Sequence, residues 1–231
     1  MTSLSAQTPT STGHPLAEAI VALAETPDDM PGIDARLQRV AQLAADRIAV
    51  VDYAAVAPRP GDGSCIVAAS GELIDAVEEV STAAPPAAMG PGTTMTWPHF
   101  RETAAGLGMR VVSVPLFTGG GAAIATLDLY SRDPDAMAAL TAGVRAAHDP
   151  ELPWPGDEGD MRALDAGAEE LLTGYAEALS VRATIQLALA MLGRSMPGGP
   201  KDAYLRLRLH AAGEGVSLLR AATTVIEADL A

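Results

Sequence analysis

The amino-acid sequence predicts an α+β domain followed by an all-helical C-terminal region. Apolar residues first recur at helical spacing, then form strand-like runs, and return to helical spacing after residue 160. A chain of 231 residues, 48% of them hydrophobic, is long enough for one or two domains with sizeable cores. The segment DPELPWPGDEGD, residues 149–160, is rich in proline, glycine and acidic residues and marks the best domain boundary.

The chain begins with a polar segment and two helical segments. Residues 1–14 have no charged and then apolar leader, so we expect a disordered tail rather than a signal segment. Residues 15–26 have the pattern of a short amphipathic helix, which PDDMPG then interrupts. Apolar residues keep one helical face over residues 32–48, which predicts a second helix.

The middle of the chain predicts two pairs of strands separated by an insertion. The expected order is strands at 48–59 and 63–71 joined by PRPGDG, a helix at 72–81, a loop at 82–96, a helix at 97–108, strands at 109–117 and 122–131 joined by TGGG, and a helix at 134–148. Asp133 is placed to cap that last helix, with Pro134 at its first position. We therefore expect an antiparallel sheet with helices packed on one face, over residues 15–148.

The region from residue 161 to residue 231 is predicted to be helical throughout. A long helix is expected from residue 161 to about 192, with an apolar stripe of Ile185, Ala188, Leu189 and Leu192. Two more helices are expected at 199–213 and 215–230.

Charge is distributed unevenly along the chain. The net charge of −14 argues against a protein that binds nucleic acid over its whole surface. From residue 181 onward, however, six basic residues face four acidic ones, a net charge of +2, which leaves −16 for the first 180 residues. An acidic regulatory domain joined to a polyanion-binding module has this asymmetry, and so does a helical bundle with a few solvated arginines.

The sequence holds no recognisable catalytic or metal-binding pattern. FTGGGAA lacks the lysine and the following helix of a phosphate-binding loop, so a hairpin turn is expected there. The four histidines have no metal-ligand spacing, and Glu169–Glu170 has the appearance of a solvated acidic pair. We expect no enzyme activity, no metal and no cofactor.

Residue composition also bears on location. No uninterrupted run of 18 apolar residues is present, so no membrane helix is expected. Cys65 is the single cysteine, which excludes an intrachain disulfide and indicates a small core residue of a strand. We expect a soluble, cytoplasmic protein.

Two of the few aromatic residues, Trp97 and Phe100, stand together in the motif WPHF. They could line a small-molecule pocket over the sheet. They could equally anchor the core beneath the helix that they begin.

The C-terminal helices resemble the ANTAR domain, a three-helix RNA-binding module of bacterial antitermination regulators. The resemblance covers about residues 161–231 and rests on ALSVRATIQLALAML, a Pro/Gly turn and DAYLRLRLHAAGEGVSLLRAATTVI. The matching residues are Ala178, Leu179, Arg182, Ile185, Gln186, Ala188, Leu192, Ala203, Tyr204, Leu207, Arg208, Ala211, Leu218, Ala221, Ala222, Val225 and Ile226.

The upstream half, residues 15–148, resembles the GAF domain that precedes ANTAR modules in actinobacteria. WPHF, VVSVPLF and ATLDLYSRDPDAM match that pattern in order. The two-domain resemblance implies a regulator that binds paired stem-loops of nascent RNA and prevents a terminator hairpin from forming. It also implies a homodimer joined through the lead-in helix, and a GAF half that senses a small molecule or serves as a scaffold.

The sequence departs from the family pattern at two places. The family's first ANTAR helix usually carries a Lys–Gly pair where this chain has Leu189 and Ala190, which removes a phosphate contact. The segment STAAPPAAMGPGTTMT, residues 81–96, is shortened and lacks the usual Gly-Pro-Cys stretch that often forms a wall of the ligand pocket.

Two main hypotheses follow. In the first, Arg182, Arg206 and Arg208 contact RNA phosphates and loop bases, together with Arg194 and Lys201 beside the turn between helices. In the second, the RNA surface has decayed, and the helices are a dimerisation or interaction module attached to a GAF scaffold or sensor. A third alternative is a small-molecule-binding GAF protein whose helical tail only drives oligomerisation.

Overall fold

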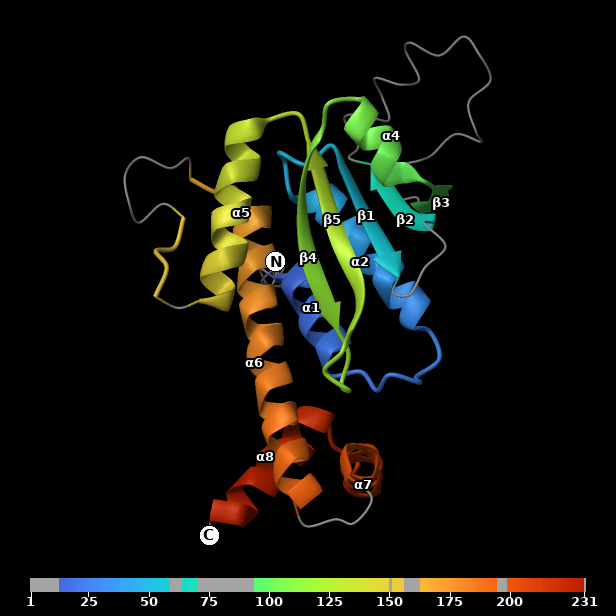
Figure 1. Ribbon diagram of the computed structural model, residues 1–231, viewed down its shortest axis with the longest axis vertical. Helices are drawn as coiled ribbons and strands as arrows, with labels where there is room; N and C mark the ends of the chain where they lie inside the picture. The colour runs from blue at the N-terminus through green and yellow to red at the C-terminus, as the bar shows by residue number, and fades with distance from the viewer. Residues whose placement is uncertain are drawn as a thin grey trace, which may run out of the picture.

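The computed structural model of the protein describes residues 13–58, 64–69, 94–149, 151–155, 163–194 and 199–230. Within these ranges it contains a five-stranded antiparallel sheet and seven helices, which confirms the expected α+β class (Figure 1). Several predicted segments lie wholly or partly outside the described residues: residues 1–12 of the tail, the turn at 59–63, the helix at 72–81, nearly all of the loop at 82–96, and residues 150 and 156–160 of the linker.

The elements follow one another in nearly the predicted order. The strands are β1 (Tyr53–Pro58), β2 (Ser64–Ala69), β3 (Thr94–Pro98), β4 (Arg110–Phe117) and β5 (Ala123–Ser131). The helices are α1 (Pro15–Ala24), α2 (Ile33–Arg47), α4 (Phe100–Gly106), α5 (Pro134–His148), α6 (Ala166–Arg194), α7 (Gly199–Glu214) and α8 (Leu218–Leu230). The Asp133 side chain accepts hydrogen bonds from the amides of Asp135 and Ala136 and so caps α5, as predicted.

The sheet has the strand order β3-β2-β1-β5-β4, and its edge strand β3 was not predicted. Residues 94–96 were expected in a loop and Trp97 in a helix, but Thr94–Pro98 pairs with β2, with Trp97 opposite Cys65. Threonine and tryptophan favour strands, and Pro98 lies at the strand's end, where it interrupts no central ladder. The helix therefore begins three residues later than predicted, at Phe100.

Helices cover both faces of the sheet, whereas one face was expected. Ala54 and Val56 of β1 face the larger core, which they share with α1, α2, α5 and α6. Ala55, between them, faces a smaller core that includes Phe100 and Ala104 of α4. Alternate residues of a strand point to opposite sides, so the apolar character of all three positions reflects a sheet covered on both faces.

The long helix α6 joins the sheet region to the C-terminal helices. Its first half packs against α1 and α5, and its second half packs against α7 and α8 (Figure 1). A Cβ atom at Gly174 would collide with the Ala17 backbone of α1, so glycine is needed where the two helices cross. Leu171 and Tyr175 in the first half and Ile185 in the second belong to one continuous hydrophobic core.

Candidate functional site

Two loops at one end of the sheet contact the C-terminal helices α6 and α7. One is the α1–α2 loop, residues 25–32, and the other is the β4–β5 turn, residues 118–122. Both lie at the end of the sheet region nearest α7 and α8 (Figure 1). Several of the predicted RNA-contacting side chains lie at this junction, so its contacts define the candidate site.

Arg182 is held by the β4–β5 turn. Its Nε donates a hydrogen bond of 2.7 Å to the carbonyl oxygen of Gly121, and its guanidinium lies 4.7 Å from the centre of the Phe117 ring. One helical turn later, Gln186 Nε2 donates to the carbonyl of Gly120 over 2.9 Å. The predicted hairpin turn is present, with Gly121 at φ +78°, and its exposed carbonyls bind α6.

Asp28 of the α1–α2 loop connects the turn to α7. Its Oδ1 accepts hydrogen bonds from Thr118 Oγ1 over 2.6 Å and from the Gly120 amide over 2.8 Å. Its own backbone amide donates to the Tyr204 hydroxyl over 3.2 Å. Burial, the main cause, raises the pKa of the Tyr204 hydroxyl above its ordinary value.

Arg208 forms an ion pair with Asp29 of the same loop. The Nη2 of Arg208 lies 2.8 Å from Asp29 Oδ1, and its Nη1 donates to Oδ2 over 2.9 Å, so the pair is bidentate. The Arg208 side chain is 31% exposed and the Asp29 side chain 63%. The Arg208 guanidinium also lies 5.7 Å from the centre of the Tyr204 ring. Arg208 is therefore a partly buried cation at the edge of the junction.

A groove of about 550 Å³ opens beside this ion pair, between α6, α7 and the two loops. Two predicted residues, Arg194 and Lys201, line it together with Asp28, Gly120, Gln186, Leu189, Ala190, Gly193 and Tyr204. Arg194 contacts Asp229 over 3.4 Å, and Lys201 is exposed. Leu189 and Ala190 form an apolar part of the lining.

Arg206 lies apart from this cluster. It is exposed on α7, two residues from both Tyr204 and Arg208. Helical residues two positions apart point about 200° away from each other, so Arg206 projects from the other side of the helix. Of the predicted residues, Arg194, Lys201 and Arg208 therefore lie near one groove. Arg182 binds the β4–β5 turn instead, and Arg206 lies outside the group.

Trp97 and Phe100 pack in an aromatic cluster on the second face of the sheet. Phe100 is 2% exposed and makes edge contacts with the rings of Tyr53, Trp97 and Tyr130, at centroid distances of 5.5, 5.2 and 5.1 Å. Phe100 therefore anchors the core beneath α4, which is one of the two alternatives that the sequence left open.

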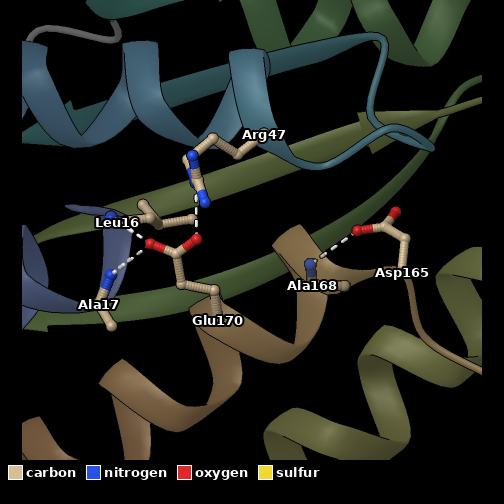
Figure 2. Close-up of polar contacts among 6 residues, drawn as sticks. All are labelled: Leu16, Ala17, Arg47, Asp165, Ala168 and Glu170. Atoms are coloured by element: carbon tan, nitrogen blue, oxygen red, sulfur yellow. Dashed lines mark hydrogen bonds and ion pairs between the residues drawn. The ribbon is translucent and has the colours of Figure 1, made fainter. Parts of the chain in front are cut away.

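Glu170 is a buried anchor that the sequence analysis missed. Its Oε1 accepts from the amides of Leu16 and Ala17 at 2.6 and 3.4 Å, and its Oε2 pairs with Arg47 Nε at 2.6 Å (Figure 2). The residue is 4% exposed, so its interpretation as part of a solvated acidic pair was wrong. In the sequence, Glu170 stands directly before the apolar pair Leu171–Leu172, and this position was the signal that could have indicated its burial.

Asp165 begins α6 in the same region. Its Oδ1 accepts a hydrogen bond of 2.8 Å from the Ala168 amide, which caps the helix (Figure 2). Glu170, one turn later, provides the first amides of α1 with a charged acceptor, which suits the positive end of a helix. These two carboxylates fix where α6 starts and how it meets α1 and α2.

Comparison with models of known protein families, with curated proteins and with solved structures yields no match. None of the helices in the described ranges has the length and apolar character that crossing a membrane requires.

Proposed function

We propose that this protein is an RNA-binding regulator of transcription antitermination, built from a GAF-like first domain and an ANTAR-like helical module. The observation that carries the proposal is that Arg194 and Lys201 line one groove and Arg208 lies over the ring of Tyr204 in its lining, on a chain with a net charge of −14. The exposed Lys201 attracts the phosphate backbone directly, whereas phosphates that reach Arg194 and Arg208 displace the exposed carboxylates of Asp229 and Asp29.

The groove also offers groups that suit unpaired RNA bases. The Tyr204 ring and the apolar Leu189 give surfaces for base contact, and the exposed Gln186 carries an amide. Protein recognition of RNA sequence mostly targets single-stranded loops, whose bases stack on aromatic rings and arginine planes. The stem-loops implied by the family resemblance present such loops. We place the RNA-contacting surface at this groove, and Arg206, on the other side of α7, lies outside it.

A direct test measures binding of the full chain to a synthetic RNA with two tandem hexaloop hairpins across a salt series. The wild type should bind, with affinity falling as salt rises. Lys201→Ala should weaken binding and reduce the slope of log K against log[salt] by about one unit, since one phosphate contact is lost. Arg220→Ala, an exposed charge on α8 outside the groove, is the matched control and should behave as the wild type.

Absence of binding at low salt by a folded protein would contradict the proposal. It would favour the second candidate, an interaction module without RNA affinity. One observation supports that candidate: Leu205 and Leu209, one turn apart on α7, are 53% and 65% exposed and offer an apolar strip to a partner such as a second copy. In either case we expect a cytoplasmic homodimer whose first domain is a scaffold or a small-molecule sensor.

A further inference from the structure

Two acidic residues of the first domain contact two side chains of the proposed RNA surface. Asp29 forms a bidentate ion pair with Arg208, and the Asp28 amide donates to the Tyr204 hydroxyl. These contacts join residues 176 and 179 positions apart, so they depend on how the first domain docks on α7.

The Asp29 carboxylate presents to Arg208 the same chemistry as a phosphate. The carboxylate is planar and the phosphate tetrahedral, but each offers two anionic oxygens that accept two parallel N–H bonds from one guanidinium. Arg208 cannot bind Asp29 and an RNA phosphate in this way at the same time. Asp29 therefore occupies the guanidinium of Arg208, to which an RNA phosphate would bind.

The α1–α2 loop is itself fixed within the first domain. Asp28 Oδ1 binds Thr118 and Gly120 of the β4–β5 turn, and the Gly119 amide donates to the Thr26 carbonyl over 2.8 Å. The same turn binds Arg182 and Gln186 of α6 through its carbonyls. Any rearrangement of the turn or the loop would move Asp29 relative to Arg208.

We propose that the α1–α2 loop is an inhibitory latch, in which Asp29 competes with RNA phosphate for Arg208 while Asp28 holds Tyr204. The latch rests on the proposed RNA-binding function and names how that function is restrained. The ion pair is partly exposed, and such pairs contribute little net stability, so RNA or a change in the first domain can displace it. The first domain thereby sets the affinity of the helical module.

The test compares Asp29→Asn with Asp34→Asn in the RNA assay described above. Both changes remove one negative charge, but Asp34 is exposed in the first turn of α2 and lines no part of the junction. Asp29→Asn should bind RNA roughly three- to fivefold more tightly, the size expected for release of a partly exposed ion pair. Its salt slope should steepen by about one unit as Arg208 gains a phosphate contact. Asp34→Asn should match the wild type.

A double-mutant cycle with Arg208→Ala assigns the effect to this pair. In the Arg208→Ala background, Asp29→Asn should no longer tighten binding. Hydrogen exchange gives a second readout: adding RNA to the wild type should speed exchange at the Asp28 and Gly120 amides, since both belong to the latch. Exchange of α6 amides near Glu170 should stay unchanged and serves as the folding control.

The outcomes separate the latch from the proposed function. If the wild type and Asp29→Asn bind RNA equally, with no change in exchange, the latch is overturned and RNA binding stands. If Asp29→Asn tightens binding no more than Asp34→Asn, the gain is general electrostatics and the latch is again overturned. If neither variant binds RNA while both remain folded, the proposed function fails and the latch fails with it.

Discussion

Arg182 matches the sequence pattern of an RNA-binding helix, but its side chain contacts another part of the same chain. The ANTAR resemblance placed it among the phosphate-contacting residues. In the structure its Nε binds the Gly121 carbonyl, and its guanidinium lies over the Phe117 ring. Both contacts connect α6 to the β4–β5 hairpin, so they stabilise the junction between the two parts of the chain.

Replacing Arg182 should therefore affect stability more than the salt dependence of RNA binding. Arg182→Ala removes a charged hydrogen bond and a cation–π contact, which together contribute about 1–3 kcal/mol to the free energy of unfolding. Arg182→Lys keeps the charge but loses the Nε donor, and we expect it to be destabilised as well. Denaturant unfolding and the RNA salt slope measure the two effects. An unchanged stability with a flatter slope would identify Arg182 as a phosphate contact instead.

At the scale of elements, α6 is the helix on which both parts of the chain depend. Its first half packs on α1 and α5, and the buried Glu170 ties it to the start of α1 and to Arg47 at the end of α2. The Glu170 side chain is 1% exposed, so its charge is tolerated because each carboxylate oxygen has a partner. Glu170 thus connects α6 to both α1 and α2.

Removing Glu170 should destabilise the protein strongly. Glu170→Ala leaves the first amides of α1 without their charged acceptor, and the loss of such a buried hydrogen-bond partner costs about 1–3 kcal/mol. Arg47 loses its partner too, but its side chain is 40% exposed and can be solvated. Glu169→Ala, at the exposed neighbour, should change the free energy of unfolding by less than about 0.5 kcal/mol. Chemical denaturation of both variants measures the difference. Equal stabilities would show that the Glu170 contacts contribute nothing net.

At the scale of the whole molecule, Tyr175 lies where α5, α6 and the sheet meet. It is fully buried, stacks on Phe117 at 6.5 Å between ring centres, and its hydroxyl lies 2.6 Å from His148 Nε2. Burial raises the pKa of Tyr175 to about 12 from its ordinary value of 10.0, partly offset by the charge of Arg182. Ionisation of this residue is therefore coupled to unfolding of the entire core.

The protein should lose stability as the pH rises from about 10 to about 12. In that range the unfolded chain releases the Tyr175 proton while the folded chain retains it, so each rise in pH favours the unfolded state. Tyr175→Phe should make the free energy of unfolding fall less steeply over this range. Tyr130, whose pKa burial also raises to about 12, leaves some slope in that variant. Denaturant unfolding at a series of pH values gives both slopes, and identical slopes would contradict the assignment to Tyr175.

The sequence by itself determined the α+β class, the order of nearly all described elements, the hairpin turn of glycines and the cap at Asp133. These features depend on hydrophobic period, on turn residues and on bonds within a few positions, all of which are local. β3 was missed for the same reason: five residues after a Pro/Gly-rich stretch carry too short a pattern, and pairing with β2 made them a strand.

Only the tertiary structure decided which partners the charged residues have. Arg208 meets Asp29 across 179 positions, Glu170 meets Leu16 across 154, and Arg182 meets Gly121 across 61. No period or motif in the sequence encodes such pairs, because they arise from docking of elements already formed. The sequence identified candidate RNA-binding cations. The packing of the α1–α2 loop and the β4–β5 turn against α6 and α7 determined which of them line the groove and which are held by these two loops.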